Sequence, residues 1–171
     1  LQLVPHLVDQ LESRGAGFSA GVLGWLKAAE SVLENNRLAA VSQIATCRAI
    51  LIEAERGLLP NDVVISGRPT PRKVRDATAS VVLTRASDLL HSVIAERQAV
   101  FQEAERISRQ VMAVAHAKGM LQTDIAPGFL ENLRQQVARD PDLATVHAHL
   151  TALVGTTDTL IFYDRALSGI A

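Results

Sequence analysis

The sequence predicts an all-α protein, an elongated antiparallel bundle of three to four long helices with a short helix at the N-terminal end. Two features of composition favour helices: 48% of the residues are hydrophobic but only 4% are aromatic, and 25 of the 171 residues are alanine. The third observation is a heptad-like spacing of apolar residues along two long segments. A chain of this length has the size of one domain, so we expect residues 1–171 to form a single helical-bundle domain.

Prolines and glycines predict where the first helices begin and end. A short helix is expected to begin at Pro5 and to end near Arg14, before the glycines at 15 and 17. A second helix is expected from an N-cap at Ser19 to Arg56, with Gly57 in the C′ position. Residues 58–70 then form the one obvious long loop.

The second half of the chain is expected to begin with its longest helix. Thr70 is a suitable N-cap, Pro71 fits the first helical position, and neither proline nor glycine follows before Gly119. This helix would contain ~48 residues and span ~70 Å at about 1.5 Å per residue. Two further helical segments are expected: one over about 127–139 after a turn at Asp124, and one from Asp140-Pro141 to about Leu167, interrupted at Gly155.

Apolar residues follow each of the two long helices in alternating steps of three and four, a pattern that we call a seam. The first seam consists of Val22, Leu26, Ala29, Leu33, Asn36, Ala40, Ile44, Cys47, Leu51 and Ala54. The second consists of Val82, Ala86, Leu89, Val93, Glu96, Val100, Ala104, Ile107, Val111 and Val114. Such seams are typical of helices that pack lengthwise, and their apolar flanks indicate more than one neighbouring helix.

Each seam contains one polar residue, Asn36 or Glu96, at its fifth position. If the two helices run antiparallel, these residues would meet near mid-height, together with Arg37 and Arg97 and with His147 from the last segment. Buried polar groups must be hydrogen-bonded and buried charges paired. The simpler interpretation is a polar layer that only sets the register of the helices. The alternative is a pocket for a small anionic ligand, as in sensory bundles.

A basic segment surrounds the predicted start of the longest helix. It consists of Arg68, Arg72, Lys73 and Arg75, around the capping residue Thr70. The free N–H groups and the dipole of a helix N-terminus favour anions, so phosphate of a nucleic acid, a lipid headgroup or a phosphorylated partner would fit here. A solvated loop with a salt bridge to Asp76 is the structural alternative, and no aromatic residues are interspersed for base stacking.

Residues suited to catalysis are sparse. Cys47 is the only cysteine and lies on an apolar stripe, so we expect a buried thiol rather than a nucleophile. Asp88 and His91 form a single D-x-x-H, whereas dimetal bundles need paired motifs. No phosphate-binding or hydrolase motif is present. We therefore expect neither an enzyme, a metal site nor a cofactor.

The charge is balanced, with 17 basic and 18 acidic residues, which argues against a general nucleic-acid coat or a polybasic membrane anchor. No apolar run approaches the ~20 residues that a membrane span needs. Arginine outnumbers lysine by 14 to 3, which hints at a GC-rich bacterial genome. The chain begins with Leu1, and no signal-peptide pattern follows, which suggests a trimmed chain or a fragment of a longer protein. A soluble, cytoplasmic protein is favoured over a secreted effector.

The leading functional hypothesis is a non-enzymatic interaction module, such as an adaptor, chaperone, effector or regulatory domain, that acts on a protein partner or as a homodimer. The first alternative is a sensory bundle that binds a small ligand at the polar layer. The second is a module that contacts the phosphates of nucleic acid or anionic lipid through residues 68–75.

Overall fold

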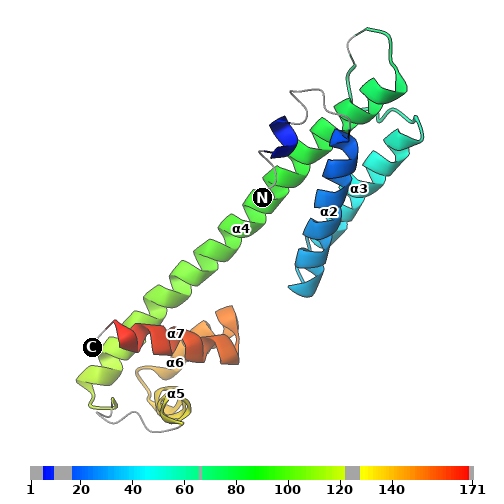
Figure 1. Ribbon diagram of the computed structural model, residues 1–171. Helices are drawn as coiled ribbons and strands as arrows, with labels where there is room; N and C mark the ends of the chain where they lie inside the picture. Colours follow the sequence, from blue (N-terminus) through cyan, green and yellow to red (C-terminus); the bar gives the residue numbers. More distant parts are fainter. Residues whose placement is uncertain (1–5, 10–16, 66, 122–127, 170–171) are drawn as a thin grey trace. The chain divides into compact units, whose positions relative to one another are not determined.

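The computed structural model describes residues 6–9, 17–65, 67–121 and 128–169. Its helices are α2 (Phe18–Asn35), α3 (Val41–Glu55), α4 (Pro71–Ala117), α5 (Phe129–Arg139), α6 (Ala144–Val154) and α7 (Thr156–Ser168) (Figure 1). No strand occurs among these described residues, which confirms the all-α prediction. Residues 6–9 are helical, while the rest of the predicted helix 5–14 and the turn at Asp124 lie outside the described residues.

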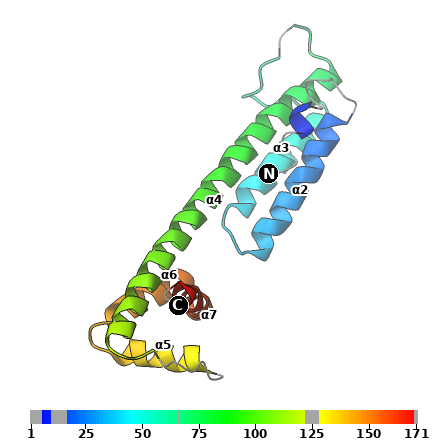
Figure 2. The same cartoon turned by 60° about the vertical axis from the view of Figure 1, so that its left-hand side comes forward.

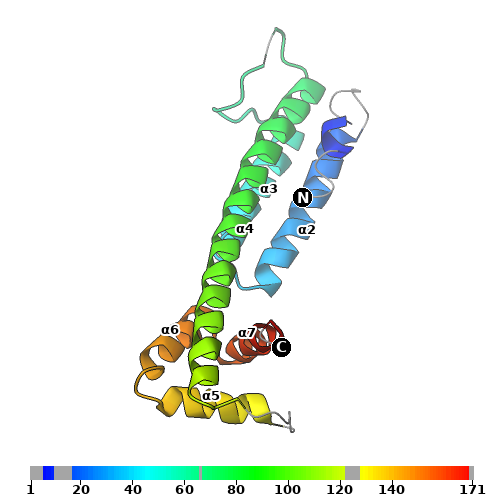
Figure 3. The ribbon, with the colours of Figure 1, turned by 90° about the vertical axis from the view of Figure 1, so that its left-hand side faces the viewer.

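The chain divides into two compact units, residues 1–94 and residues 95–171, and α4 contributes to both. The assignment of the whole chain to one domain stays a prediction. In unit 1, α2 and α3 lie side by side as a helical hairpin (Figure 3). The first half of α4 completes the core, which includes Phe18, Val22, Trp25, Leu26 and Leu33 of α2, Ile44, Cys47 and Leu51 of α3, and Ala79, Val82, Leu83 and Ala86 of α4.

The prediction of one continuous helix from Ser19 to Arg56 is wrong, because the chain turns back after Asn35. Arg37 adopts a left-handed conformation with φ 52°, and two hydrogen bonds close the helix end. The Arg37 N–H donates to the Glu34 carbonyl at 2.9 Å, and the Leu38 N–H donates to the Leu33 carbonyl at 2.9 Å. This pair of bonds defines a Schellman motif, with arginine where glycine is usual.

Two other helix ends follow the sequence prediction. Gly57 and Gly119 occupy the left-handed C′ positions of α3 and α4, with φ 88° and 70°. At the start of α4, the Lys73 N–H donates to the Thr70 hydroxyl at 3.3 Å, which confirms Thr70 as the cap. The predicted N-cap at Ser19 is wrong, because the N-cap of α2 is Gly17, whose φ of 115° suits glycine.

Unit 2 consists of the second half of α4 and the three short helices, which gather beside it (Figure 2). Gly155 separates α6 from α7 as predicted, with φ 87°. The core of unit 2 includes Ala104, Ile107, Val111, Met112 and Ala115 of α4, Phe129, Leu133 and Val137 of α5, Leu150 of α6, and Phe162, Tyr163 and Ala166 of α7.

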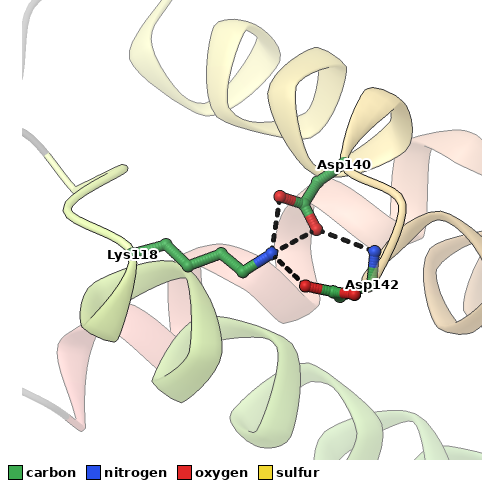
Figure 4. Close-up of polar contacts among 3 residues, drawn as sticks. All are labelled: Lys118, Asp140 and Asp142. Atoms are coloured by element: carbon green, nitrogen blue, oxygen red, sulfur yellow. Dashed lines mark hydrogen bonds and ion pairs between the residues drawn. The ribbon is translucent and has the colours of Figure 1, made fainter.

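An ion-pair cluster joins the end of α4 to the turn between α5 and α6 (Figure 4). The Lys118 ammonium donates to both carboxylate oxygens of Asp140 and to Asp142, each at 2.7 Å. The Asp142 N–H also donates to the Asp140 carboxylate at 3.0 Å. The hydrogen bond from Lys118 lowers the pKa of the Asp140 carboxyl below its ordinary value. The cluster therefore links this corner of unit 2 through the ionised carboxylate of Asp140.

We predict that Arg37→Gly stabilises unit 1 by about 0.5–1 kcal/mol. A left-handed conformation costs a non-glycine residue roughly 1–2 kcal/mol, and the greater unfolded-state freedom of glycine offsets part of this gain. Urea unfolding followed by the fluorescence of Trp25, the only tryptophan and a core residue of unit 1, measures the change. Asn36→Gly is the matched control, because φ of Asn36 is −95° and glycine gains nothing there. An equal or negative change for Arg37→Gly would contradict the left-handed assignment.

We predict that Lys118→Gln makes the stability of unit 2 less sensitive to acid. Because the pKa of Asp140 is lowered in the folded state, its contribution is present above the ordinary aspartate value and is lost as pH falls through the lowered value. Thermal unfolding at about pH 7 and pH 2, followed by the absorbance of the single tyrosine Tyr163, compares the variants. Lys27→Gln is the control, because among the described residues the exposed Lys27 makes no ion pair. If the parent, Lys118→Gln and Lys27→Gln all lose the same stability between the two pH values, the ion-pair cluster contributes nothing to the stability of unit 2.

Candidate functional site

The structure places the five residues of the predicted polar layer in different surroundings. Asn36 and Arg37 are exposed at the turn between α2 and α3 in unit 1. Glu96 and Arg97 are exposed on α4, and only His147 of α6 is buried. Four of the five side chains are therefore exposed and one is buried, and the polar layer stays a prediction. Whether any of them contacts a ligand stays a prediction.

His147 takes part in a different polar contact, which the sequence did not indicate. Its Nδ1 lies 2.8 Å from the hydroxyl of Tyr163 on α7, and both side chains are buried in unit 2. Burial lowers the pKa of His147, and the charge of Arg134 on α5 lowers it further. Burial also raises the pKa of Tyr163. The pair is therefore neutral and closes the core between α6 and α7.

The residues of the basic segment differ in what they contact. Arg68 and Lys73 are exposed, and Thr70 caps α4. Arg72 lies 3.4 Å from Asp76, the salt bridge that was expected as the structural alternative. Arg75 is half-buried, and among the described residues no hydrogen bond or ion pair holds its guanidinium. Arg75 therefore differs from the exposed Arg68 and Lys73 in being partly buried, with a guanidinium that no carboxylate among the described residues neutralises.

A cavity of about 280 Å³ lies in unit 1, where α2 begins, α3 ends and α4 begins. Its lining consists of Gly17, Ser19 and Ala20 of the α2 start, Glu55 of α3, and Arg72, Arg75 and Asp76 of α4. Among the described residues, no side chain caps the N-terminus of α2, because the N-cap residue is glycine. Ser19 is 9% exposed, and its buried hydroxyl oxygen has no hydrogen-bond partner in the same part of the chain. Sequence reasoning found the two arginines but missed the α2 residues, since they are distant in the chain.

A second cavity, of about 430 Å³, lies in unit 2 between α4 and α7. Its lining contains one acidic and two basic side chains, and both arginines pair with the same carboxylate: Glu105 lies 3.9 Å from Arg109 and 4.0 Å from Arg165. The Arg165 guanidinium also lies over the ring of Phe162, 5.9 Å from its centroid. The arrangement is that of a surface groove with internally paired charges.

Large apolar side chains are exposed on the loop between α3 and α4, residues 56–70. The exposed fractions of Leu58, Leu59 and Val64 are 59%, 46% and 91%. Val63 between them is buried, so the loop is anchored rather than detached. Asp62 strengthens the anchor by accepting a hydrogen bond from Arg85 of α4 at 2.6 Å.

Cys47 is buried as expected, and burial raises the pKa of its thiol, with the charge of Arg85 offsetting part of the rise. Within residues 6–9, 17–65, 67–121 and 128–169, no group of three or more histidine, cysteine or acidic side chains could hold a metal ion. None of the helices in those ranges is both long and apolar enough to cross a bilayer.

No protein-family model, curated protein or solved structure matches the chain significantly. The features that can indicate a function for this chain are therefore the surfaces and cavities of its two units.

We predict that the stability of unit 2 falls as pH decreases from about 7 to 5 and that His147→Gln removes this fall. The pKa of His147 is lowered by folding, so the unfolded chain binds the proton more tightly and stability is lost below the ordinary histidine value of about 6.5. One proton corresponds to at most about 1.4 kcal/mol per pH unit. Chemical unfolding at several pH values measures the slope.

The control for this prediction is His149→Gln, two residues away on the same helix and exposed. It should keep the slope of the parent. A slope that persists in His147→Gln, or that disappears equally in His149→Gln, would assign the proton to another group.

Proposed function

We propose that the chain is a non-enzymatic helical interaction module that docks on an acidic protein surface through the α3–α4 loop. The observation that carries the proposal is the exposure of Leu58, Leu59 and Val64 on one anchored loop. Single exposed aliphatic residues are common on soluble proteins, whereas a cluster on one segment is typical of a contact surface. Burial of such a side chain against a partner contributes roughly 1.5–3 kcal/mol.

The anchoring of the loop supports docking because it lowers the cost of association. Val63 is buried, and its N–H donates to the Pro60 carbonyl at 3.1 Å. At the start of the loop, the Leu58 N–H is held by the Glu53 carbonyl at 3.2 Å. A surface that is ordered before binding loses less conformational entropy when a partner covers it.

The charge around the loop favours an acidic partner. Residues 56–75 contain five basic side chains and one acidic side chain, a net charge of +4. The whole chain has a net charge of −1, so the remaining residues together carry −5. A local excess of positive charge increases the rate of association with an acidic surface and selects against basic ones.

The bundle arrangement and the ligand-sensing alternative are two further proposals. The α2–α3 hairpin with the first half of α4 supports an antiparallel bundle in unit 1. A sensory function at Asn36, Arg37, Glu96, Arg97 and His147 has less support, because four of these side chains are exposed.

Site-specific photo-crosslinking tests the proposed docking surface. A photoreactive residue at position 64 should give a discrete adduct in cells that produce the protein, with either a second copy or an acidic protein. The matched control is position 32, because Val32 is 61% exposed on α2 outside the loop. With the purified partner, the double variant Leu58→Ser/Val64→Ser should bind at least about tenfold more weakly, the loss typical of central interface residues, while Val32→Ser should change affinity less than about twofold.

The affinity for an acidic partner should also fall as salt concentration rises. Equal crosslinking at positions 32 and 64, or unchanged affinity of the double variant, would contradict docking through the loop.

A further inference from the structure

We infer that the cavity of unit 1 binds the phosphate group of a small ligand, held by Arg75, Arg72, the Ser19 hydroxyl and the N-terminus of α2. This site is distinct from the apolar docking surface proposed above, because neither Ser19 nor Arg75 belongs to the α3–α4 loop, although the arginines add positive charge near both. Three separate features of the cavity support the inference: an uncapped helix end, an unpartnered buried hydroxyl and an unpaired arginine.

The first feature is the start of α2. Its N-cap Gly17 has no side chain that could accept the hydrogen bonds of the first helical N–H groups. Gly17, Ser19 and Ala20 all line the cavity, so this end of the helix borders the space directly. Helix N-termini present N–H groups and the positive end of the helix dipole, and both favour an anion.

The second feature is the Ser19 hydroxyl, which is buried and has no hydrogen-bond partner among the residues that the structure describes. Leaving such a group unsatisfied costs about 1–3 kcal/mol, so native proteins usually pair it with protein, water or ligand. Ser19 follows the N-cap by two residues and lines the same cavity. A phosphate oxygen bound at this end of α2 would supply an acceptor once the hydroxyl turns toward the cavity.

The third feature is the pair of arginines on α4. Arg75 is half-buried and, among the described residues, has no carboxylate or carbonyl partner, although Arg72 beside it pairs with Asp76 at 3.4 Å. Two guanidinium groups offer several N–H donors in fixed planes, a geometry that suits phosphate oxygens. The cavity volume of about 280 Å³ accommodates a phosphate group with a small substituent.

Two carboxylates in the lining restrict which ligand fits. Asp76 is partly neutralised by Arg72, whereas among the described residues Glu55 has no ion pair. Glu55 therefore repels a bare phosphate and favours a ligand whose other end donates hydrogen bonds. The predicted class is a small phosphate monoester with a hydroxyl or amino substituent.

Isothermal titration calorimetry of the full chain with inorganic phosphate and with glycerol phosphate tests this inference. We expect dissociation constants at or below about 1 mM in low salt. Arg75→Gln should weaken binding at least about tenfold, because charge-assisted hydrogen bonds are lost. Lys73→Gln is the matched control, since Lys73 is exposed on the same helical turn but does not line the cavity, and it should change the affinity less than about twofold.

Two further variants keep the test independent of folding defects. Ser19→Ala removes an unsatisfied hydroxyl, so it should leave the thermal midpoint without ligand unchanged or higher while it weakens phosphate binding about three- to tenfold. Glu55→Gln removes a repulsive charge, so it should bind inorganic phosphate about two- to fivefold more tightly than the parent.

Vesicles that contain phosphatidic acid distinguish a lipid headgroup from a soluble source of phosphate. Vesicle binding that is lost in Arg75→Gln would support the phosphate site with a lipid as its source. Absence of binding to both phosphate and vesicles, or equal affinities of the parent, Arg75→Gln and Ser19→Ala, would overturn the inference. Loss of loop docking in Leu58→Ser/Val64→Ser with phosphate binding intact would show that the two sites are separate.

Discussion

The structure depends on the unbroken hydrogen-bond ladder of α4, a helix of 47 residues without an internal proline or glycine after Pro71. Both cores require this helix: Val82 and Ala86 belong to the core of unit 1, and Ile107 and Val111 to that of unit 2. An isolated helix is only marginally stable in water, so the packing at each end maintains the ladder. From residue 94 to 99 every side chain is exposed, and this stretch, IAERQA, contains mostly strong helix formers.

In a continuous bundle, a polar residue within an apolar seam would indicate a buried polar layer. In this protein the two polar seam residues lie at a turn and next to the boundary between the two units. Asn36 follows the last residue of α2, where the backbone turns back, and Glu96 lies next to the boundary between the two units. At both places the apolar packing ends rather than being interrupted by a buried layer. The physical reason is desolvation: a polar side chain loses least free energy where no neighbouring helix covers it.

The proposed docking loop and the proposed phosphate site both lie at the end of unit 1 where α4 begins. Helix ends carry unpaired backbone groups, and the loop that joins α3 to α4 carries apolar side chains without intramolecular cover. The two proposed interactions use different chemistry, since one depends on aliphatic burial and the other on hydrogen bonds to an anion. The arginines at the start of α4 contribute positive charge to both. A phosphate ligand bound at Arg75 would reduce this charge and thereby weaken attraction to an acidic partner.

The sequence by itself determined the all-α class, the extent of α4, and the helix ends at Thr70, Gly57 and Gly119, because capping and the absence of helix breakers are local properties. It also identified the packed face of the long segments, since 13 of the 20 seam residues are buried, and heptad spacing marks that face whether or not a helix continues. Tertiary structure decided the hairpin at Arg37, because no local rule favours arginine in a left-handed conformation. It also decided the His147–Tyr163 pair and the grouping of Ser19 with Arg75, since these residues meet only through packing of distant segments.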